Sequence, residues 1–571
     1  MNRPRFSGTK INSFMNQQPG LTPLGKVLSF LIIVALLGLG GYVVRQKSEH
    51  GDRGTSTSAS AGAGASAEEK SGVVEPMTET PHLPTAAPYV PKDNVVAIEL
   101  SEYAGYSGLI AANGGMEPNE DSFFFKKYGF KVKLSLSEEE SWPALNTGKL
   151  AASATTADVL AVYGRQFQVV VPAQIGFSRG ADGLIVTSDI KRINALKGKV
   201  IATSQFTEAD FFVRYLAQEA GMTVKTLGSL DATPSPDAVN VVYCADAFAA
   251  GDLFLAELKS GHKRLAGCMT WAPKTTEVVD KSEGKAIMLT SNRNLLIVAD
   301  ILVVNRGFAE QQPKMVAGLV HGLIEGNRRV RENPNDYLDL LGKAFKWDRA
   351  KAKAELEKVH LANLPESQAF FSGAIDAAGS FGGIYQSAVY AYGKDLIKNP
   401  ADPEHFLSLK ALDALQATGE YASQQIAIAP IRGGSKPVLE DNPLLSRDIR
   451  FYFEPNSAKL DLTNQDNLKS LEDIKRLLQV SPGSTILLRG HVDNGMVDKF
   501  RSQGGEPFVR QMAMAAMELS RNRASEVKQQ VINKFKADGT RMETVGRGWE
   551  EPAGPDHDKN RRVEVQWFTL E

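Results

Sequence analysis

The blocks LSRNRASEV (519–527), VGRGWEEP (545–552) and NRRVEVQW (560–567) follow the strand-like run TILLRGHVD (485–493) near the end of the chain. Asp493 ends that run, Arg523 stands in a helical segment, and Arg561 precedes a last strand-like segment. Such a set can converge on one zwitterionic ligand, because a guanidinium holds a carboxylate with two hydrogen bonds while a carboxylate holds an ammonium. The alternative is a group of ordinary surface ion pairs, which contribute little.

The order of these blocks resembles the OmpA-like (MotB-like) peptidoglycan-binding family over about residues 449–568. The resemblance implies a small α/β domain of βαβ type at 446–571 that clamps the diaminopimelate of a peptidoglycan stem peptide. It assigns the contact to Asp493, Arg523, Asn560 and Arg561. The spacing departs from the family, because Arg523 comes 30 positions after Asp493 and MVDKFRSQGGEPFVRQMAMAAM (496–517) looks like an insertion. Whether the insertion preserves the pocket stays open.

The length and charge of the chain bound its class. A chain of 571 residues is too long for one hydrophobic core and predicts about two to four domains. The formal net charge of −1 gives no drive towards nucleic acid or acidic membranes. Basic stripes interleaved with aromatic residues are also missing from the sequence, so we expect no nucleic-acid partner.

An apolar run near the N-terminus predicts one transmembrane helix. VLSFLIIVALLGLGGYVV (27–44) has no charged residue and would span about 27 Å as a helix, just enough for a hydrocarbon core. A signal peptide is the alternative, but its apolar region is usually shorter and no small-residue cleavage site follows directly. We therefore expect an uncleaved inner-membrane anchor with residues 1–26 in the cytoplasm and the rest in the periplasm.

Two segments read as linkers. Residues 45–93 are rich in Ser, Ala, Gly, Thr and Pro, a composition typical of a flexible tether. A shorter linker is expected at 426–445. The two cysteines, Cys244 and Cys268, can pair in an oxidising periplasm or remain small buried side chains, and their spacing leaves both options open.

Between the linkers, residues 94–425 alternate strand-like and helix-like runs, which predicts α/β architecture with mainly parallel sheets and, at this length, two lobes. The order of segments resembles periplasmic solute-binding proteins of the nitrate/sulfonate/taurine type. LKGKVIATSQFTEADFFVRYLAQEAG (196–221) carries the resemblance most specifically. It implies a hinged receptor, like the substrate-binding part of ABC transporters, that closes on a small solute.

The expected cleft has two helix starts that suit an anion. Ser204 and Thr207 follow one buried strand, and Thr155 and Thr156 follow another, so free backbone N–H groups and hydroxyls point outward at both. The alternative for these residues is simple N-capping. Trp271 can wall the organic part of a ligand or belong to the core. The resemblance adds Asp300, which can reach a hinge or a bound amine, and Tyr106 in SEYAGYSGLIAANGG (101–115).

Enzyme signals do not cohere. GFSRG (176–180) matches a nucleophile elbow, but another strand-like run follows it where an elbow needs a helix. The eight histidines show no metal-binding spacing. We expect neither catalysis nor a metal or cofactor.

The whole sequence predicts a single-pass inner-membrane protein that binds a small anionic or zwitterionic solute and attaches to peptidoglycan. The alternative is a structural envelope linker whose receptor-like domain binds a membrane or periplasmic protein.

Overall fold

In the computed structural model, residues 72–137, 141–374, 379–428, 443–454, 457–481 and 483–568 are described. The predicted segment 1–26, the predicted membrane helix 27–44 and residues 45–71 of the predicted tether lie outside the described residues, as do 429–442 of the second linker. Within the described ranges, no helix combines the length and apolar character that a membrane span requires.

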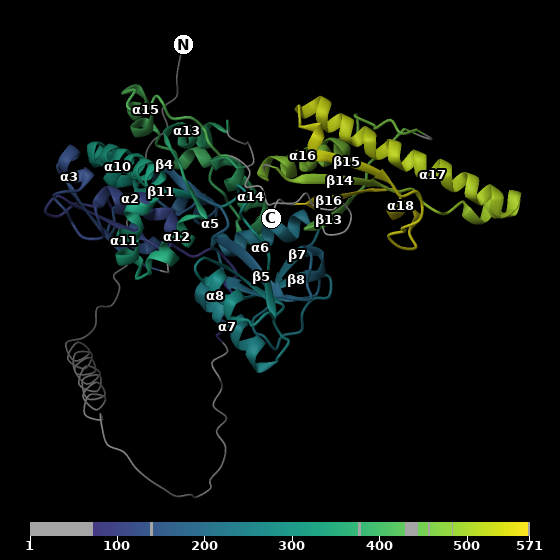
Figure 1. Cartoon of the computed structure of the whole chain (residues 1–571), viewed down its shortest axis with the longest axis horizontal. Helices are drawn as coiled ribbons and strands as arrows, with labels where there is room; N and C mark the ends of the chain where they lie inside the picture. Colours follow the sequence, from purple (N-terminus) through teal and green to yellow (C-terminus); the bar gives the residue numbers. More distant parts are fainter. Residues whose placement is uncertain are drawn as a thin grey trace, which may run out of the picture. The chain divides into compact units, whose positions relative to one another are not determined.

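The receptor-like domain is built on two six-stranded sheets, one in each lobe (Figure 1). The first sheet has the strand order β12 (Val359–Leu361), β4 (Val169–Ser178), β11 (Ala299–Asn305), β3 (Ala152–Thr156), β1 (Val95–Leu100) and β2 (Lys131–Leu136). The second has the order β10 (Ala286–Ser291), β5 (Asp182–Thr187), β9 (Gly267–Trp271), β6 (Val200–Ser204), β8 (Ala238–Cys244) and β7 (Thr223–Thr226). The predicted two-lobed α/β architecture is confirmed.

Parallel pairs form only part of each sheet. β1 pairs in parallel with β2 and β3, and β6 does so with β8 and β9. β11 and β5, by contrast, run antiparallel to both of their neighbours. Both sheets are therefore mixed. β5 is the first strand that the chain forms in the second lobe, β11 is the first that it forms on returning to the first lobe, and each runs antiparallel to its neighbours.

The helices of this domain connect the strands of the two sheets and follow them in the chain. In chain order they are η1 (Ala104–Tyr106), α2 (Ser107–Asn113), α3 (Phe123–Tyr128), α4 (Trp142–Asn146), α5 (Val159–Tyr163), α6 (Glu208–Glu219), α7 (Ala247–Ser260), α8 (Lys274–Lys281), α9 (Arg306–Gln311), α10 (Pro313–Glu332), α11 (Pro334–Phe345), α12 (Arg349–Leu356), α13 (Leu364–Ser372), α14 (Phe381–Leu396) and α15 (Lys410–Ala417). The 3-10 turns η2 (Gly164–Gln166), η3 (Ile193–Leu196) and η4 (Pro403–Phe406) lie between them.

Two chain crossings join the lobes, from β4 to β5 and from β10 to β11. Asn292 holds them together, because its Oδ1 accepts the backbone N–H of Gly180 at 2.8 Å and its Nδ2 donates to Asp182 Oδ2 at 2.9 Å. Arg179 Nε also donates to the carbonyl of Arg293 at 2.6 Å. The crossings thus form one hydrogen-bonded hinge.

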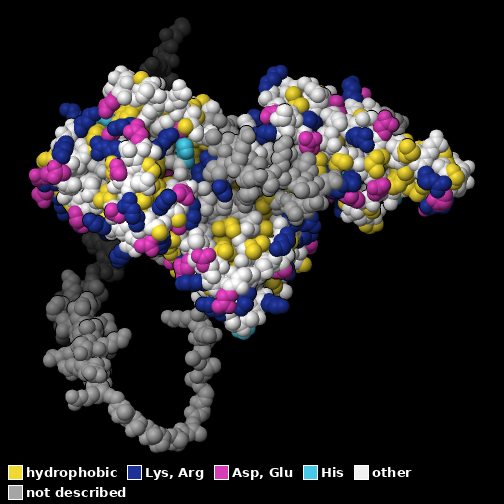
Figure 2. Space-filling view, viewed as in Figure 1, with side chains coloured by type: hydrophobic (Ala, Val, Ile, Leu, Met, Phe, Trp, Pro, Cys, Tyr) yellow, Lys and Arg dark blue, Asp and Glu magenta, His cyan; other side chains and the backbone are white. Residues whose placement is uncertain are grey.

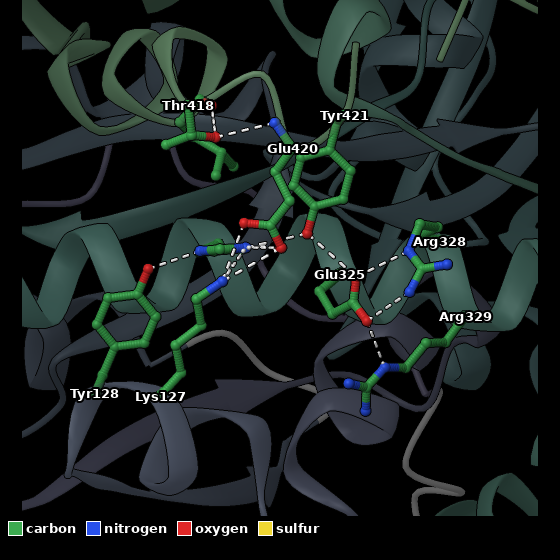
Figure 3. Close-up of polar contacts among 10 residues, drawn as sticks. Lys127, Tyr128, Glu325, Arg328, Arg329, Thr418, Glu420 and Tyr421 are labelled. Carbon is green, nitrogen blue, oxygen red and sulfur yellow. Dashed lines mark hydrogen bonds and ion pairs between the residues drawn. The ribbon is translucent and has the colours of Figure 1, made fainter. Parts of the chain in front are cut away.

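Helix α10 is fixed in the first lobe by close backbone packing and by a polar network. A Cβ on Gly326 would lie 1.9 Å from the Gly108 carbonyl oxygen, so only glycine allows α2 and α10 to pack this closely. Figure 3 shows Glu325 of α10 between Arg328 and Arg329, with the Tyr421 hydroxyl donating to it at 3.1 Å. These three donors lower the net cost of burying the carboxylate.

Residues 72–93 correct the predicted extent of the tether. Val74 pairs with Tyr243 of β8, and Met77 exchanges two hydrogen bonds with the Gln205 side chain, so this part contacts the second lobe. Further along, the Leu83 N–H donates to Gln166 in the first lobe. Composition predicted a coil, but these specific contacts hold the segment as a strap across both lobes.

Both cysteines are buried free thiols, on β8 and β9. Burial raises the pKa of the Cys244 thiol to about 12 and also raises that of Cys268. The structure therefore favours small buried side chains over a disulfide.

The C-terminal domain has a four-stranded sheet in the order β13 (Leu445–Ile449), β16 (Val563–Phe568), β14 (Thr485–Gly490) and β15 (Met542–Gly546). Its helices are α16 (Gln465–Val480), α17 (Val497–Phe535) and α18 (His557–Asn560), and the turn η5 (Gly539–Arg541) precedes β15. β14 and β15 are parallel and α17 connects them, which gives the predicted βαβ unit.

The predicted insertion forms the first part of α17. The helix is interrupted at Gly504 and Gly505, where the backbone leaves helical geometry just before Pro507. Apolar side chains lie along this helix in Figure 2, and Met514 is 76% exposed. The later part of α17 packs on the sheet and carries Arg523.

Candidate functional site

A cavity of about 300 Å³ lies between the two sheets, within the size range of small-molecule sites. Six of the seven residues predicted for the cleft line it: Tyr106, Thr156, Ser204, Thr207, Trp271 and Asp300. Thr155 is not among the lining residues, because it is buried in β3 opposite Ile301 of β11. The residues predicted from separate stretches of sequence therefore meet at one site.

The start of α6 does not offer the anion site that its sequence predicts. The backbone N–H of Phe206 donates to Asp210 Oδ2 at 3.2 Å, and the Thr207 hydroxyl donates to the Ser204 carbonyl at 3.0 Å. Glu208 and Asp210 also place two carboxyls in the first turn. The positive end of this helix thus faces the chain's own acidic groups.

The second predicted anion site fails for a similar reason. The Ala157 N–H donates to the Ala299 carbonyl at 3.0 Å, and α5 has only five residues. Asp158 stands at its N-terminus and is fully buried, and burial raises the pKa of this carboxyl to about 7. An acidic side chain therefore stands at this helix start, and the anionic or zwitterionic character of the solute stays a prediction.

Two buried carboxyls face the cavity beside the hinge. Asp182 opens β5 and Asp300 lies in β11, each just after one of the crossings. Asp300 Oδ2 accepts the Tyr103 hydroxyl at 3.3 Å, and Asp182 Oδ2 accepts Asn292 Nδ2. Burial raises the pKa of Asp182 to about 6; burial, and then the charge of Asp182, raise the pKa of Asp300 well above its ordinary value.

Aromatic rings make up much of the remaining wall. Tyr103 and Tyr106 pack edge to face with ring centroids 5.2 Å apart, and Trp271 lies against Phe248 at 5.4 Å. Burial raises the pKa of Tyr103, so its hydroxyl remains a proton donor. Trp271 is 9% exposed and lines the cavity, which makes it both a core residue and a wall of the site.

Sequence reasoning missed Tyr103, Ser178 and Asp182, which all line the cavity. Ser178 and Asp182 flank the first crossing, where the sequence shows only a short connection between two strands. Their position at a crossing between lobes, rather than in a hairpin, was the missing information. Tyr103 lies three residues before Tyr106 in the segment 101–115, and this proximity is the signal that identifies it.

The peptidoglycan residues predicted in the C-terminal domain meet in part. Arg561 Nη1 lies 3.4 Å from Asp493 Oδ2, and the Gly495 N–H donates to Asp493 Oδ1 at 3.0 Å. Arg523 donates to the Ser457 carbonyl at 3.2 Å and lies over the Phe453 ring. Burial, and then the charge of Arg561, lower the pKa of Arg523, while Asp493 opposes this effect. The three charged groups therefore share one site despite the insertion.

Asn560 takes a different position from the other three. It is 2% exposed, its Oδ1 accepts the Ala553 N–H at 2.7 Å, and its Nδ2 donates to the Gly554 carbonyl at 3.0 Å. Both bonds stay within the loop 553–560. Its amide thus shapes the loop that presents Arg561.

A group in this domain has ligand atoms suitable for a metal. Atoms of His491, Glu551 and Glu564 lie within 4.8 Å of one another. Arg489, however, forms ion pairs with both glutamates, at 2.7 Å to Glu551 and through Nη1 to Glu564. One guanidinium therefore pairs with both carboxylates, and the group forms a partly buried ion network.

Comparisons with known proteins agree with the two-domain description. The OmpA family matches residues 452–566, so the chain carries an OmpA-family domain at this end. Outer membrane protein Omp38 of Acinetobacter baumannii is 25% identical over 140 residues, covering 24% of this chain and 33% of that protein. The chain thus spans about a third of the length of the curated relatives it matches.

Among solved structures, the periplasmic aliphatic sulphonate binding protein SsuA from Escherichia coli is 15% identical, with a TM-score of 0.42; the match covers 57% of this chain and all of that one. The periplasmic nitrate-binding protein NrtA from Synechocystis PCC 6803 is 14% identical, with a TM-score of 0.40, and the match covers 57% and 90% of the two chains.

Proposed function

We propose that this chain is an envelope receptor that binds a small solute between its lobes and attaches to peptidoglycan through its OmpA-family domain. The observation that carries the first half is the cavity at the hinge, where buried polar groups from both sheets converge. The second half is supported by the family match and by the grouping of Asp493, Arg523 and Arg561. Solute binding and wall attachment need no catalytic group, and we propose no enzymatic activity.

The apolar run 27–44 supports an inner-membrane anchor, with the N-terminus in the cytoplasm and the two domains in the periplasm. In this arrangement the OmpA-family domain reaches the stem peptides of the wall, and closure of the receptor on its solute is a signal that an inner-membrane partner can read. The diaminopimelate contact falls to Asp493 for the ammonium and to Arg523 and Arg561 for the carboxylate.

Cosedimentation of the full-length protein with purified sacculi tests wall attachment. We expect Asp493→Ala and Arg523→Ala each to abolish pelleting, because each removes one half of the zwitterion contact. Asp498→Ala is the matched control, since Asp498 is an exposed carboxylate on α17 that pairs with Arg501. Full retention of pelleting by both site variants would show that the wall is held elsewhere.

A structural linker is the second candidate, and the strap favours it. Residues 72–93 contact both lobes, and Met77 of the strap lines the cavity. A strap of this kind limits opening and suits a domain that holds a protein partner. Copurification of a membrane protein that is unaffected by Asp300→Asn would support this candidate over a solute receptor.

A further inference from the structure

The charges that line the cavity are of one sign. Four carboxyls contribute to the wall, from Asp182, Glu208, Asp246 and Asp300. Lysine, arginine and histidine are absent from the lining, as far as the structure describes the chain. An anion entering this space would lose its water and meet only like charge, a combination that costs several kcal/mol.

Within the described residues, the two carboxyls beside the hinge are hydrogen-bonded by neutral groups. Asp182 is bonded by the amide of Asn292 and the hydroxyl of Ser178, and Asp300 by the phenol of Tyr103. By contrast, Asp210 in the same lobe has its own guanidinium, because Arg214 Nε donates to it at 2.8 Å. Asp210 thus has a cationic partner, whereas the described contacts of Asp182 and Asp300 are with neutral groups.

Two hydroxyls give an independent indication of a missing donor. Thr156 Oγ1 and Ser178 Oγ are buried in the wall of the cavity, and neither makes a hydrogen bond of ordinary geometry within the described part of the chain. Each interacts through its O–H with a neighbouring carboxyl, Thr156 with Asp158 and Ser178 with Asp182, which leaves its oxygen lone pairs as acceptors. Buried polar atoms are normally satisfied, so a ligand that donates hydrogen bonds would complete the site.

The aromatic side chains select the same kind of ligand. Six aromatic residues line the cavity, among them Tyr106 and Trp271 on opposite lobes. Aromatic faces attract cations, most strongly when both are shielded from water. On the face that Figure 2 shows, acidic and basic side chains are interspersed, whereas the charged groups of the cavity lining are all acidic.

We infer that the solute is a small organic ammonium compound, whose cationic head lies between Asp182 and Asp300 and whose apolar body lies against Trp271 and Tyr106. This inference rests on the proposed receptor function and names its ligand class. A cation supplies the charge that both carboxyls lack, and its N–H or polarised C–H groups face the hydroxyls of Thr156 and Ser178. Because Asp182 and Asp300 each follow one crossing, the same contact draws the hinge strands together and favours the closed domain.

The test is calorimetric titration of the full-length protein with four probes: choline, putrescine, ethanesulfonate, and 3,3-dimethyl-1-butanol as the uncharged analogue of choline. We expect saturable binding of choline or putrescine and none of the other two. Asp300→Asn is expected to weaken that binding about 10- to 100-fold, which corresponds to one charged hydrogen bond. Asp182→Asn gives the same readout should Asp300→Asn not fold. Asp189→Asn, which alters an exposed carboxyl outside the cavity, is expected to bind as the unmodified protein does.

The titrations distinguish a wrong ligand class from a wrong receptor function. Binding of ethanesulfonate without binding of either ammonium compound would overturn the ligand class and leave the solute receptor intact. Equal binding of choline and its uncharged analogue would likewise overturn the role of the carboxyls. Failure of all four probes to bind would overturn the receptor function itself, and the inference with it.

Discussion

Asp182→Asn should make the unliganded receptor domain more stable, because it removes a buried charge that lacks a cationic partner. Burial raises the pKa of Asp182 from 3.8 to about 6. A shift of about two pKa units corresponds to about 3 kcal/mol. Asparagine has nearly the same shape, and its side-chain oxygen can still accept the hydrogen bond from Asn292.

The sign of the pH dependence follows from where the proton is held. The folded protein binds the Asp182 proton more tightly than the unfolded chain does. Its ionised form is therefore penalised in full above about pH 6, and the penalty disappears below about pH 4, where both states are protonated. The variant should accordingly gain up to about 3 kcal/mol above pH 6, or roughly 6–12 °C in unfolding midpoint, and nothing at pH 4.

Tryptophan fluorescence during thermal unfolding, measured from pH 4 to pH 8, provides the assay. Asp189→Asn is the control, because Asp189 is exposed and a hydrogen bond from Thr187 lowers its pKa. That variant should show no gain at high pH. A loss of stability in Asp182→Asn that is equal at every pH would contradict the inference that burial of the Asp182 charge is unfavourable. It would mean that the carboxylate is a satisfied structural group.

Three further predictions concern parts of the chain outside the cavity. Arg214→Met leaves the Asp210 carboxylate buried without its guanidinium and should lower the free energy of unfolding, measured in urea, by about 3–5 kcal/mol. A decrease below about 1 kcal/mol would contradict the pairing. Gly490→Ala places a Cβ 2.0 Å from the Ser520 carbonyl oxygen, so α17 should detach from the sheet and sacculus binding should fall. Gly228→Ala is the control, because a Cβ there has no neighbour within 4 Å, and this variant should bind sacculi normally. Because burial raises the pKa of both thiols, Cys244 should resist a thiol reagent in the folded protein and react in urea, and rapid labelling without urea would argue against its burial.

The sequence predicted the architecture well where a regular pattern determines it. Alternating strands and helices predicted the two sheets, and the order of blocks around Asp493 and Arg523 predicted the C-terminal βαβ unit. Five of the six cleft residues, all but Asp300, lie at or after the C-terminal end of a strand, and such ends meet at the same edge of a sheet. Asp300 lies near the start of β11, which reaches the same edge because it runs antiparallel to its neighbours.

The charge of the site could not be predicted in the same way. Helix starts such as Ser204–Thr207 suggested an anion, but the Phe206 N–H in this segment donates to Asp210, four residues further along the chain. Asp182 and Asp300 come together only because the chain crosses twice between the lobes, and the local sequence does not indicate these crossings. The prediction for the strap was wrong for a related reason. Its composition is that of a coil, but a few long-range hydrogen bonds, such as that from the Met77 N–H to Gln205, determine its position.

A crystal structure of the full-length protein as purified from its host, without added ligand, would show whether the cavity between the sheets holds a solute. We expect density for a small molecule in this cavity, in contact with Asp182, Asp300 and Trp271. A cavity filled by the protein's own side chains, with a lysine or arginine paired to these carboxylates, would contradict it.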